Sequence, residues 1–496
     1  MHSQVTHHVP PLLFAPELAP VPTRQVAKKT LARKDKLPKV SSSYTQRAKK
    51  SKVSKRNGPM GEDDKANARL MRQMGICYRC RFYKSKCDPG LPCNNCLKTK
   101  DNARVFKLPC SRERLVDAAL VRHCNGRFAQ DAVRFITDYQ WREGNVFDMV
   151  FMWNLPPSGD VPSNSSQLAH RPIRAGCRLY SPTQTELDTT SSPWKDITGN
   201  VRDISQAPYA IYDTANFQMQ VQQYLLNIMP SLEAEVFSRV RNDDLASLTF
   251  TEAVRFRYAQ HSELIDTAMK ITCLSMVSQG YGNVISENIP GVRKYAESGY
   301  PHMGYTLYEA YNRSSHDRPL PTAINHQWDV AVLLLLKQLE LKALKILEKK
   351  TFKGGPKAEL PWYEIYLALF VLVWNMAFIK TSANRYIESK SDTALENQVR
   401  ATVSRQISDW DRSFSLILMH WRGVLRDFKP FMLGRENPEE LRKMGQIDET
   451  AFRYVRGTCE ILARKGIDRH QPPLIAPSPT ASEWIKMIFR EAGADT

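Results

Sequence analysis

The chain has 496 residues, of which 42% are hydrophobic and 24% charged, which is ordinary for a soluble globular protein with room for several domains. Its 70 Lys and Arg residues outnumber its 51 Asp and Glu residues, giving a net charge of +19. This surplus is concentrated: residues 1–60 hold 13 basic and 2 acidic residues, and residues 77–110 hold 8 and 2. Such a basic block indicates a polyanionic partner, with nucleic acid first; a solubilising tail or a localisation signal alone is the alternative.

Composition also argues against export and membrane insertion. The opening "MHSQVTHHVPPLLFAPELAP" lacks the charged start and apolar core of a secretory signal. The longest apolar run, residues 365–379, contains Asn375 and is too short to span a bilayer, so it predicts a buried core helix. We therefore expect a protein of the cytosol or nucleus, where thiols stay reduced and clustered cysteines indicate metal rather than disulfides.

The N-terminal residues 1–70 are rich in Pro, Ser and Lys and show no sustained apolar period, which predicts a disordered basic arm. Its two basic clusters are candidate nuclear-import signals, or arms that contact phosphates. The candidate residues are Lys28, Lys29, Arg47, Lys49, Lys50, Lys52, Lys55 and Arg56.

A cysteine cluster, "CYRCRFYKSKCDPGLPCNNC", follows the arm and defines a predicted module at residues 72–112. Two C-x₂-C pairs can each bend round one ion, and no histidine lies between residues 77 and 110 to complete a mixed site. Six thiolates cannot fill two separate tetrahedral sites, but they suffice for two Zn²⁺ ions if two sulfurs are shared. The candidate ligands are Cys77, Cys80, Cys87, Cys93, Cys96 and Cys110.

Residues 113–207 are predicted to be a linker and irregular region, with a Pro/Ser/Thr-rich stretch between residues 156 and 194. Leu115 and Ala119 have the spacing of a short coiled coil, but Gly126 ends it before three heptads are complete. We therefore expect one copy on DNA, or a homodimer formed through the C-terminal helical domain.

Helical spacing dominates residues 208–496, which predicts an all-α regulatory domain. A cap at Thr251 is expected to open the second of its helices. The expected helices cover residues 217–240, 250–277, 326–350, 360–379, 397–425 and a last one near 482–493. Together with the module and the arm, this makes the predicted fold class mainly α.

The cysteine cluster resembles the fungal Zn₂Cys₆ binuclear-cluster DNA-binding domain. "CYRCRFYKSKC" matches the first half of that family's pattern, "DPGLP" its proline-containing loop and "CNNCLK" its second half. The thirteen residues before Cys110 are more than the family's usual last interval. Cys110 is kept as the sixth ligand because the nearest other cysteine downstream is Cys124.

The resemblance implies two zinc ions per chain, bridged by Cys77 and Cys93, and a helix after Cys80 that enters the DNA major groove. By position Lys84 is the candidate for contact with guanine edges of a CGG-type triplet, and Lys and Arg are suited to that contact. Arg81 and Lys86 would bind phosphates or also approach bases. Tyr83 stands where many members of the family carry a basic residue, so base recognition by this protein is expected to differ from theirs.

These observations favour a nuclear, sequence-specific, zinc-dependent transcription factor that regulates RNA polymerase II genes. Its expected partners are double-stranded DNA and the transcription machinery or co-regulators, with no membrane. The alternatives are a purely structural zinc knot, and a nucleic-acid-binding zinc protein or scaffold without sequence preference. An enzyme in the helical domain is not expected, because the sequence has no G-x-G-x-x-G, G-K-[ST], G-x-S-x-G or H-E-x-x-H motif.

Overall fold

The computed structural model describes residues 61–99, 109–123, 139–156, 172–182, 190–195, 199–294, 296–298, 317–352, 361–426, 428–465 and 481–491. The predicted arm at residues 1–60 and its eight candidate import residues lie outside this part of the chain. The arm was predicted to run to residue 70, but residues from Glu62 on form a helix, α1 (Glu62–Met74). Residues 61–496 group into one unit by their contacts.

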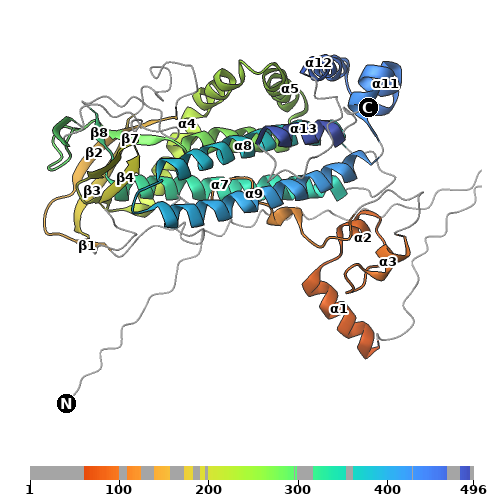
Figure 1. Ribbon diagram of the computed structural model, residues 1–496, viewed down its shortest axis with the longest axis horizontal. Helices are drawn as coiled ribbons and strands as arrows, with labels where there is room; N and C mark the ends of the chain where they lie inside the picture. The colour runs from red at the N-terminus through yellow and green to blue at the C-terminus, as the bar shows by residue number, and fades with distance from the viewer. Residues whose placement is uncertain are drawn as a thin grey trace, which may run out of the picture. The chain divides into compact units, whose positions relative to one another are not determined.

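Most of the described residues are helical, as predicted (Figure 1). Two short helices belong to the cysteine cluster: α2 (Tyr78–Phe82) and α3 (Asn94–Lys98). The remaining helices are α4 (Thr214–Val240), α5 (Asp244–Gln260), α6 (Glu263–Val277), α7 (Thr322–Phe352), α8 (Trp362–Ser389), α9 (Glu396–Leu425), α10 (Pro430–Glu436), α11 (Pro438–Gly445), α12 (Glu449–Lys465) and α13 (Ala481–Glu491).

Helix α8 lies at the centre of the helical bundle, as its apolar sequence predicts. It packs against α5, α6, α9 and α13, so that nearly every side chain from Tyr363 to Val373 is buried. Its length and hydropathy would also suit a membrane span, but 72% of its most apolar stretch is buried inside the protein. An all-round apolar helix is what a fully enclosed position requires, because no face is left for water.

The predicted helix at residues 250–277 is in fact two helices, α5 and α6. His261 adopts a left-handed conformation (φ 49°) that ends α5, and the Ser262 side chain accepts a hydrogen bond from the Ile265 amide at 3.2 Å to begin α6. Thr251 does not cap a helix: the cap of α5 is Asp243, which accepts from the amides of residues 245 and 246. The apolar pattern hid the break because both segments bury a face in the same core.

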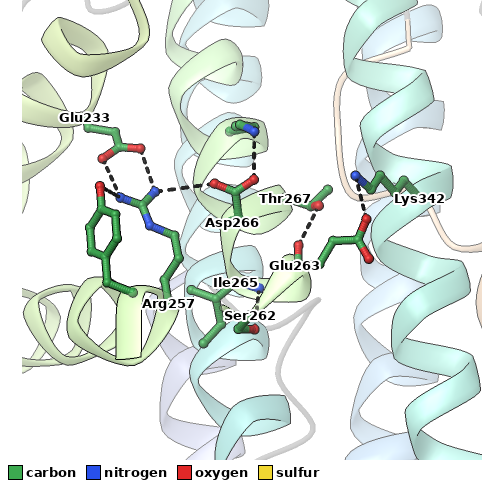
Figure 2. A network of polar contacts seen from close by, with 10 residues as sticks. Glu233, Arg257, Ser262, Glu263, Ile265, Asp266, Thr267 and Lys342 are labelled. Atoms are coloured by element: carbon green, nitrogen blue, oxygen red, sulfur yellow. Dashed lines mark hydrogen bonds and ion pairs between the residues drawn. The ribbon is translucent and has the colours of Figure 1, made fainter. Parts of the chain in front are cut away.

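Ion pairs, some buried and one exposed, connect four of these helices (Figure 2). Arg257 of α5 is 7% exposed and donates to both carboxylate oxygens of Glu233 on α4, at 2.7 and 2.9 Å. Asp266 of α6 lies 3.8 Å from the same guanidinium. Lys342 of α7 contacts Glu263 of α6 at 2.9 Å. Bidentate arginine–carboxylate geometry of this kind fixes the register between helices.

The prediction that residues 208–496 are all-α and residues 113–207 irregular is wrong, because strands occur in both. An antiparallel sheet has the order β1-β3-β2-β7-β8, with β6 also paired to β3, and β4 and β5 form a separate pair. The strands are β1 (Gln140–Trp141), β2 (Phe147–Asn154), β3 (Ile173–Ser181), β4 (Ser191–Lys195), β5 (Val201–Ser205), β6 (Tyr209–Ile211), β7 (Tyr281–Val284) and β8 (Arg318–Pro319).

The sheet packs against one end of the bundle (Figure 1). Trp153 of β2 stacks on Trp328 of α7 with ring centroids 4.7 Å apart, and its indole N–H donates to the Val277 carbonyl at 2.9 Å. The short strands could not be predicted from the sequence because their partners are distant along the chain: β2 pairs with β7, which lies between α6 and α7. Short apolar runs of this kind do not distinguish a strand from a helix.

A segment that was predicted to be linker is buried between α7, α8 and α9. We call residues 118–123 the anchor segment; its residues from Ala118 to Val121 are at most 8% exposed. Its backbone hydrogen bonds go to bundle side chains: the Ala119 N–H to Ser413 (2.7 Å), the Leu120 N–H to Glu340 (2.5 Å), the Leu120 carbonyl from Asn375 (3.0 Å) and the Val121 carbonyl from Trp410 (3.0 Å).

The anchor segment explains two features of the sequence. Leu115 and Ala119, which have coiled-coil spacing, are buried against the bundle of the same chain rather than available to a second copy. Asn375, the polar residue within the apolar run, satisfies a buried carbonyl of the anchor segment. The cysteine module is therefore joined to the bundle by a fixed attachment that begins a few residues after Cys110.

Candidate metal centre and nucleic-acid interface

The two short helices of the cysteine module both begin directly after a cysteine. Cys77 precedes α2 and its sulfur accepts from the Cys80 amide at 3.4 Å, while Cys93 precedes α3. Each C-x₂-C pair therefore spans the first turn of a helix, which brings its two sulfurs to the same side. The Leu91–Pro92 peptide between the two halves is cis.

The six sulfurs form two groups of four that share two members. One group is Cys77, Cys80, Cys87 and Cys93, and the other is Cys77, Cys93, Cys96 and Cys110. Within each group all sulfurs lie within 4.8 Å of one another. The shared residues are Cys77 and Cys93, and Cys110 joins the second group despite the long interval that precedes it.

The spacing of the sulfurs suits tetrahedral zinc. Four sulfurs at about 2.3 Å from one ion lie about 3.8 Å apart. The distances from Cys77 to Cys93 and Cys96 are 3.9 and 3.7 Å, and that from Cys80 to Cys93 is 3.6 Å. A disulfide would need about 2.05 Å, and all six thiols are free. The donor set therefore fits two four-coordinate ions with two common ligands.

The thiols need a cation to ionise together. Burial raises the pKa of Cys77 well above its ordinary value, and burial with a hydrogen bond to Cys93 raises the pKa of Cys96 to about 12. Burial also opposes ionisation of Cys93, but hydrogen bonds from Cys96, Cys80 and Cys87 lower its pKa to about 6. Proton loss at one thiol is thus stabilised by protons on its neighbours, and bound divalent cations would replace those protons.

Polar groups around the sulfurs complete the candidate metal centre. Arg79 is 8% exposed, and its guanidinium lies 3.8 Å from the Cys96 sulfur. Asn95 donates to the Cys80 sulfur at 3.3 Å, and the Cys93 amide donates to the Cys110 sulfur at 3.3 Å. Donors of this kind orient thiolates and stabilise their negative charge.

The loop between the two halves is held by residues whose role the sequence reading did not predict. Asp88 accepts from the Gly90 amide at 3.0 Å and from the Asn94 amide at 2.8 Å. Arg112 donates to the carbonyls of Asp88 at 2.6 Å and Gly90 at 2.9 Å, and also to the Gly75 carbonyl. Arg112 follows the last cysteine, and no sequence signal distinguishes it from the other basic residues nearby.

The four predicted DNA-contacting residues fall into two pairs. Lys84 and Lys86 are exposed, and Lys84 has a left-handed backbone (φ 50°) just past the end of α2. Arg81 is also partly exposed, at 39% of its side chain, but its guanidinium pairs with Glu348 of α7 at 2.7 Å. Tyr83 is half-buried against the apolar core, and Arg79 lies 5.3 Å from its ring centroid. Two of the four candidates therefore face the helical bundle.

Comparison with known proteins indicates the same class of protein as the geometry of the cysteines does. That class is a fungal transcription factor of the zinc cluster type. The chain belongs to the KpeA transcription factor family, which matches residues 172–466, more than half of its length. This match covers β3 to β8 and α4 to α12, and it does not include the cysteine module.

Two relatives support this assignment. The Satratoxin biosynthesis SC3 cluster transcription factor SAT20 of Stachybotrys chartarum is 26% identical over 408 residues, 81% of this chain and 53% of that protein. Transcription factor kpeA of Aspergillus oryzae is 39% identical over 61 residues, 12% of this chain and 8% of that protein. The chain thus spans about half the length of the first relative and a small part of the second. No solved structure matches the chain.

Proposed function

We propose that this transcription factor binds double-stranded DNA sequence-specifically through residues 77–110, with two Zn²⁺ ions holding the module, and regulates RNA polymerase II genes in the nucleus. The observation that carries the proposal is the pair of four-sulfur groups that share Cys77 and Cys93. A closed, all-thiolate site is the structural kind of zinc site, so we propose no catalysis there.

Each residue has a distinct part in the proposed binding. Zinc would supply the rigid platform that 35 residues cannot obtain from an apolar core. The exposed Lys84 would donate to guanine O6 and N7, because it stands at the end of α2 where the backbone turns away from the helix. Lys86, two residues further and also exposed, would bind phosphate and set the register.

The experiment is selection from a randomised duplex pool with the full chain. We expect an enriched CGG-like triplet, and the Lys84→Ala variant should lose about 1–3 kcal/mol of binding and relax the preference at one base pair. Lys342→Ala is the matched control, because Lys342 lies on α7 and pairs with Glu263 of α6. It removes the same charge and should leave the preference unchanged.

The competing function is nucleic-acid binding without sequence preference. The basic residues of the module favour it in part, because phosphate contacts alone produce salt-dependent affinity. An unenriched pool, together with equal affinity for random and selected duplexes, would establish this second function in place of the first. A homodimer formed through the helical domain stays a proposal, which light scattering with and without duplex would test.

A further inference from the structure

Helix α2 contributes to two interiors at once. Its cysteines, Cys77 and Cys80, point into the sulfur cluster, whereas Tyr78 and Phe82 belong to the apolar core of the bundle and are 3% and 2% exposed. Tyr78 and Phe82 are four residues apart and therefore lie on one face of the helix. The helix that would present the module to DNA is thus also the helix that attaches the module to α7 and α9.

Tyr78 is the centre of this contact. Its ring meets Phe352 of α7 at 5.4 Å and His420 of α9 at 4.5 Å, both edge-on. Its hydroxyl lies over Gly423 of α9, where an added Cβ would be 1.9 Å from the oxygen and 3.0 Å from Cζ. Only glycine at position 423 allows the ring to reach its place, so the surface of α9 is shaped for α2.

Charged residues close the edges of the contact. The Arg81 guanidinium donates to Glu348 at 2.7 Å and lies 4.1 Å from the Phe352 ring centroid. Arg426, at the end of α9, lies 5.0 Å from the Phe82 ring centroid. Glu348 is 8% exposed, so its carboxylate is largely withdrawn from water and depends on Arg81 as a close cationic partner.

The Arg81 side chain is 39% exposed in the docked arrangement, but its guanidinium already pairs with Glu348. A phosphate that approaches Arg81 in the docked arrangement also meets the negative charge of Glu348, and like charges at short range repel. Undocking removes that repulsion and frees the guanidinium for DNA. Ala118 to Val121 are buried in the bundle independently of α2, so the module would remain attached when α2 leaves its place.

We propose that docking of α2 onto α7 and α9 is an autoinhibitory contact, in which the Arg81–Glu348 pair and the Tyr78–Gly423 fit hold the DNA-binding module in a closed state. This inference rests on the proposed function. Apparent DNA affinity is reduced by the fraction of molecules that are closed, so any change that opens the contact raises it. The helical domain thereby sets DNA affinity without touching DNA.

The first test is Gly423→Ala in the full chain, with zinc present. The added methyl displaces Tyr78 and should speed hydrogen exchange across residues 78–83. Affinity for the selected duplex, followed by fluorescence anisotropy, should rise about fivefold or more as the competent fraction grows. Gly457→Ala is the matched control, because its Cβ would meet only Leu248, at the ordinary distance of 3.8 Å.

A second substitution in the same background separates docking from general damage. Tyr78→Phe removes the oxygen that collides with the new methyl, and among the described residues that hydroxyl has no hydrogen-bond partner. The double variant Tyr78→Phe/Gly423→Ala should therefore return both exchange and affinity toward wild-type values. A variant that had merely lost stability would not be rescued in this way.

The third variant tests the charge rather than the shape. Glu348→Gln keeps the size of the side chain and removes its charge, so DNA affinity should rise. The slope of log affinity against log salt concentration should also steepen, by the amount expected for about one more phosphate contact. In an Arg81→Ala background the same substitution should have no such effect on the salt dependence.

Several outcomes would overturn the inference. Unchanged exchange in Gly423→Ala would mean that α2 is not held against α9. Faster exchange with equal or weaker DNA affinity would mean that the docked arrangement is the one that binds DNA. Failure of the proposed function is distinguishable, because then the wild type and every variant would retain zinc but bind the selected duplex no better than a random one, or bind neither. The inference would then fall with it.

Discussion

The cysteine module and the helical bundle differ in what fills their interiors. The module has a small interior of six cysteines, four of them buried, whereas the bundle and sheet share one large apolar core. With the proposed zinc ions bound, ligand bonds would hold the first interior, whereas exclusion of water holds the second. At α2 the two interiors meet in five residues, where Tyr78 and Phe82 belong to the core of the bundle.

Removal of the metal should have the largest effect and should unfold the module without unfolding the bundle. A strong chelator is expected to cost the module about 10–16 kcal/mol of binding energy that acts as folding energy. DNA binding should be lost, while circular dichroism keeps nearly all of its helical signal, since α4 to α13 contain no predicted ligand. A collapse of the whole helical signal on chelation would show that the bundle depends on the cluster.

A core truncation in the bundle should do the opposite: it should lower the stability of the bundle and leave metal binding by the module unchanged. Phe370 of α8 is fully buried and meets Phe250 and Phe489 edge-on. Phe370→Ala is expected to lower the free energy of unfolding by about 3–5 kcal/mol. Denaturant titration measures that loss, and the zinc content of the native variant should equal that of the wild type. Loss of zinc in this variant would contradict the separation of the two interiors.

A smaller effect is expected at the end of the anchor segment. Burial opposes protonation of His123, but its hydrogen bond to Glu340 at 2.8 Å and the charge of that carboxylate raise its pKa above the ordinary 6.5. A raised pKa in the folded state means that protonated His123 stabilises the fold. This contribution is complete below pH 6.5 and is lost as the pH rises through the folded pKa.

The measurement is the free energy of unfolding as a function of pH, for wild type and His123→Gln. The wild type should lose stability relative to the variant as the pH rises above 6.5, because only the wild type gives up the proton that His123 holds in the folded state. Parallel pH profiles for the two proteins would contradict the role assigned to the His123–Glu340 pair.

The sequence predicted the long helices and the cysteine cluster because both have local signals. Apolar periodicity marks α4, α7, α8 and α9, and the spacing of the cysteines marks the two halves of the cluster. The sheet could not be predicted in this way, since its strands are short and β7, which pairs with β2, lies between two helices. Strand pairing over such distances leaves no local period.

The position of Arg81 could not be predicted for a related reason. Its place after the second cysteine assigns it to DNA, but its neighbour Glu348 is 267 residues away. The aromatic residues Tyr78 and Phe82 carried a weak signal, since two large apolar side chains on a short helix of a small module require a surface to cover them. That signal indicates an interface but does not name the partner.

Zinc content in native mass spectra of the full chain tests the central claim most directly, because the account depends on two four-sulfur groups with common members. The wild type should carry two Zn²⁺ ions. Cys87→Ser alters one group only and should retain one ion. Cys93→Ser alters both groups and should retain less zinc than Cys87→Ser. A wild type with one zinc or none, or variants that lose zinc equally, would contradict the shared cluster and the DNA-binding function built on it.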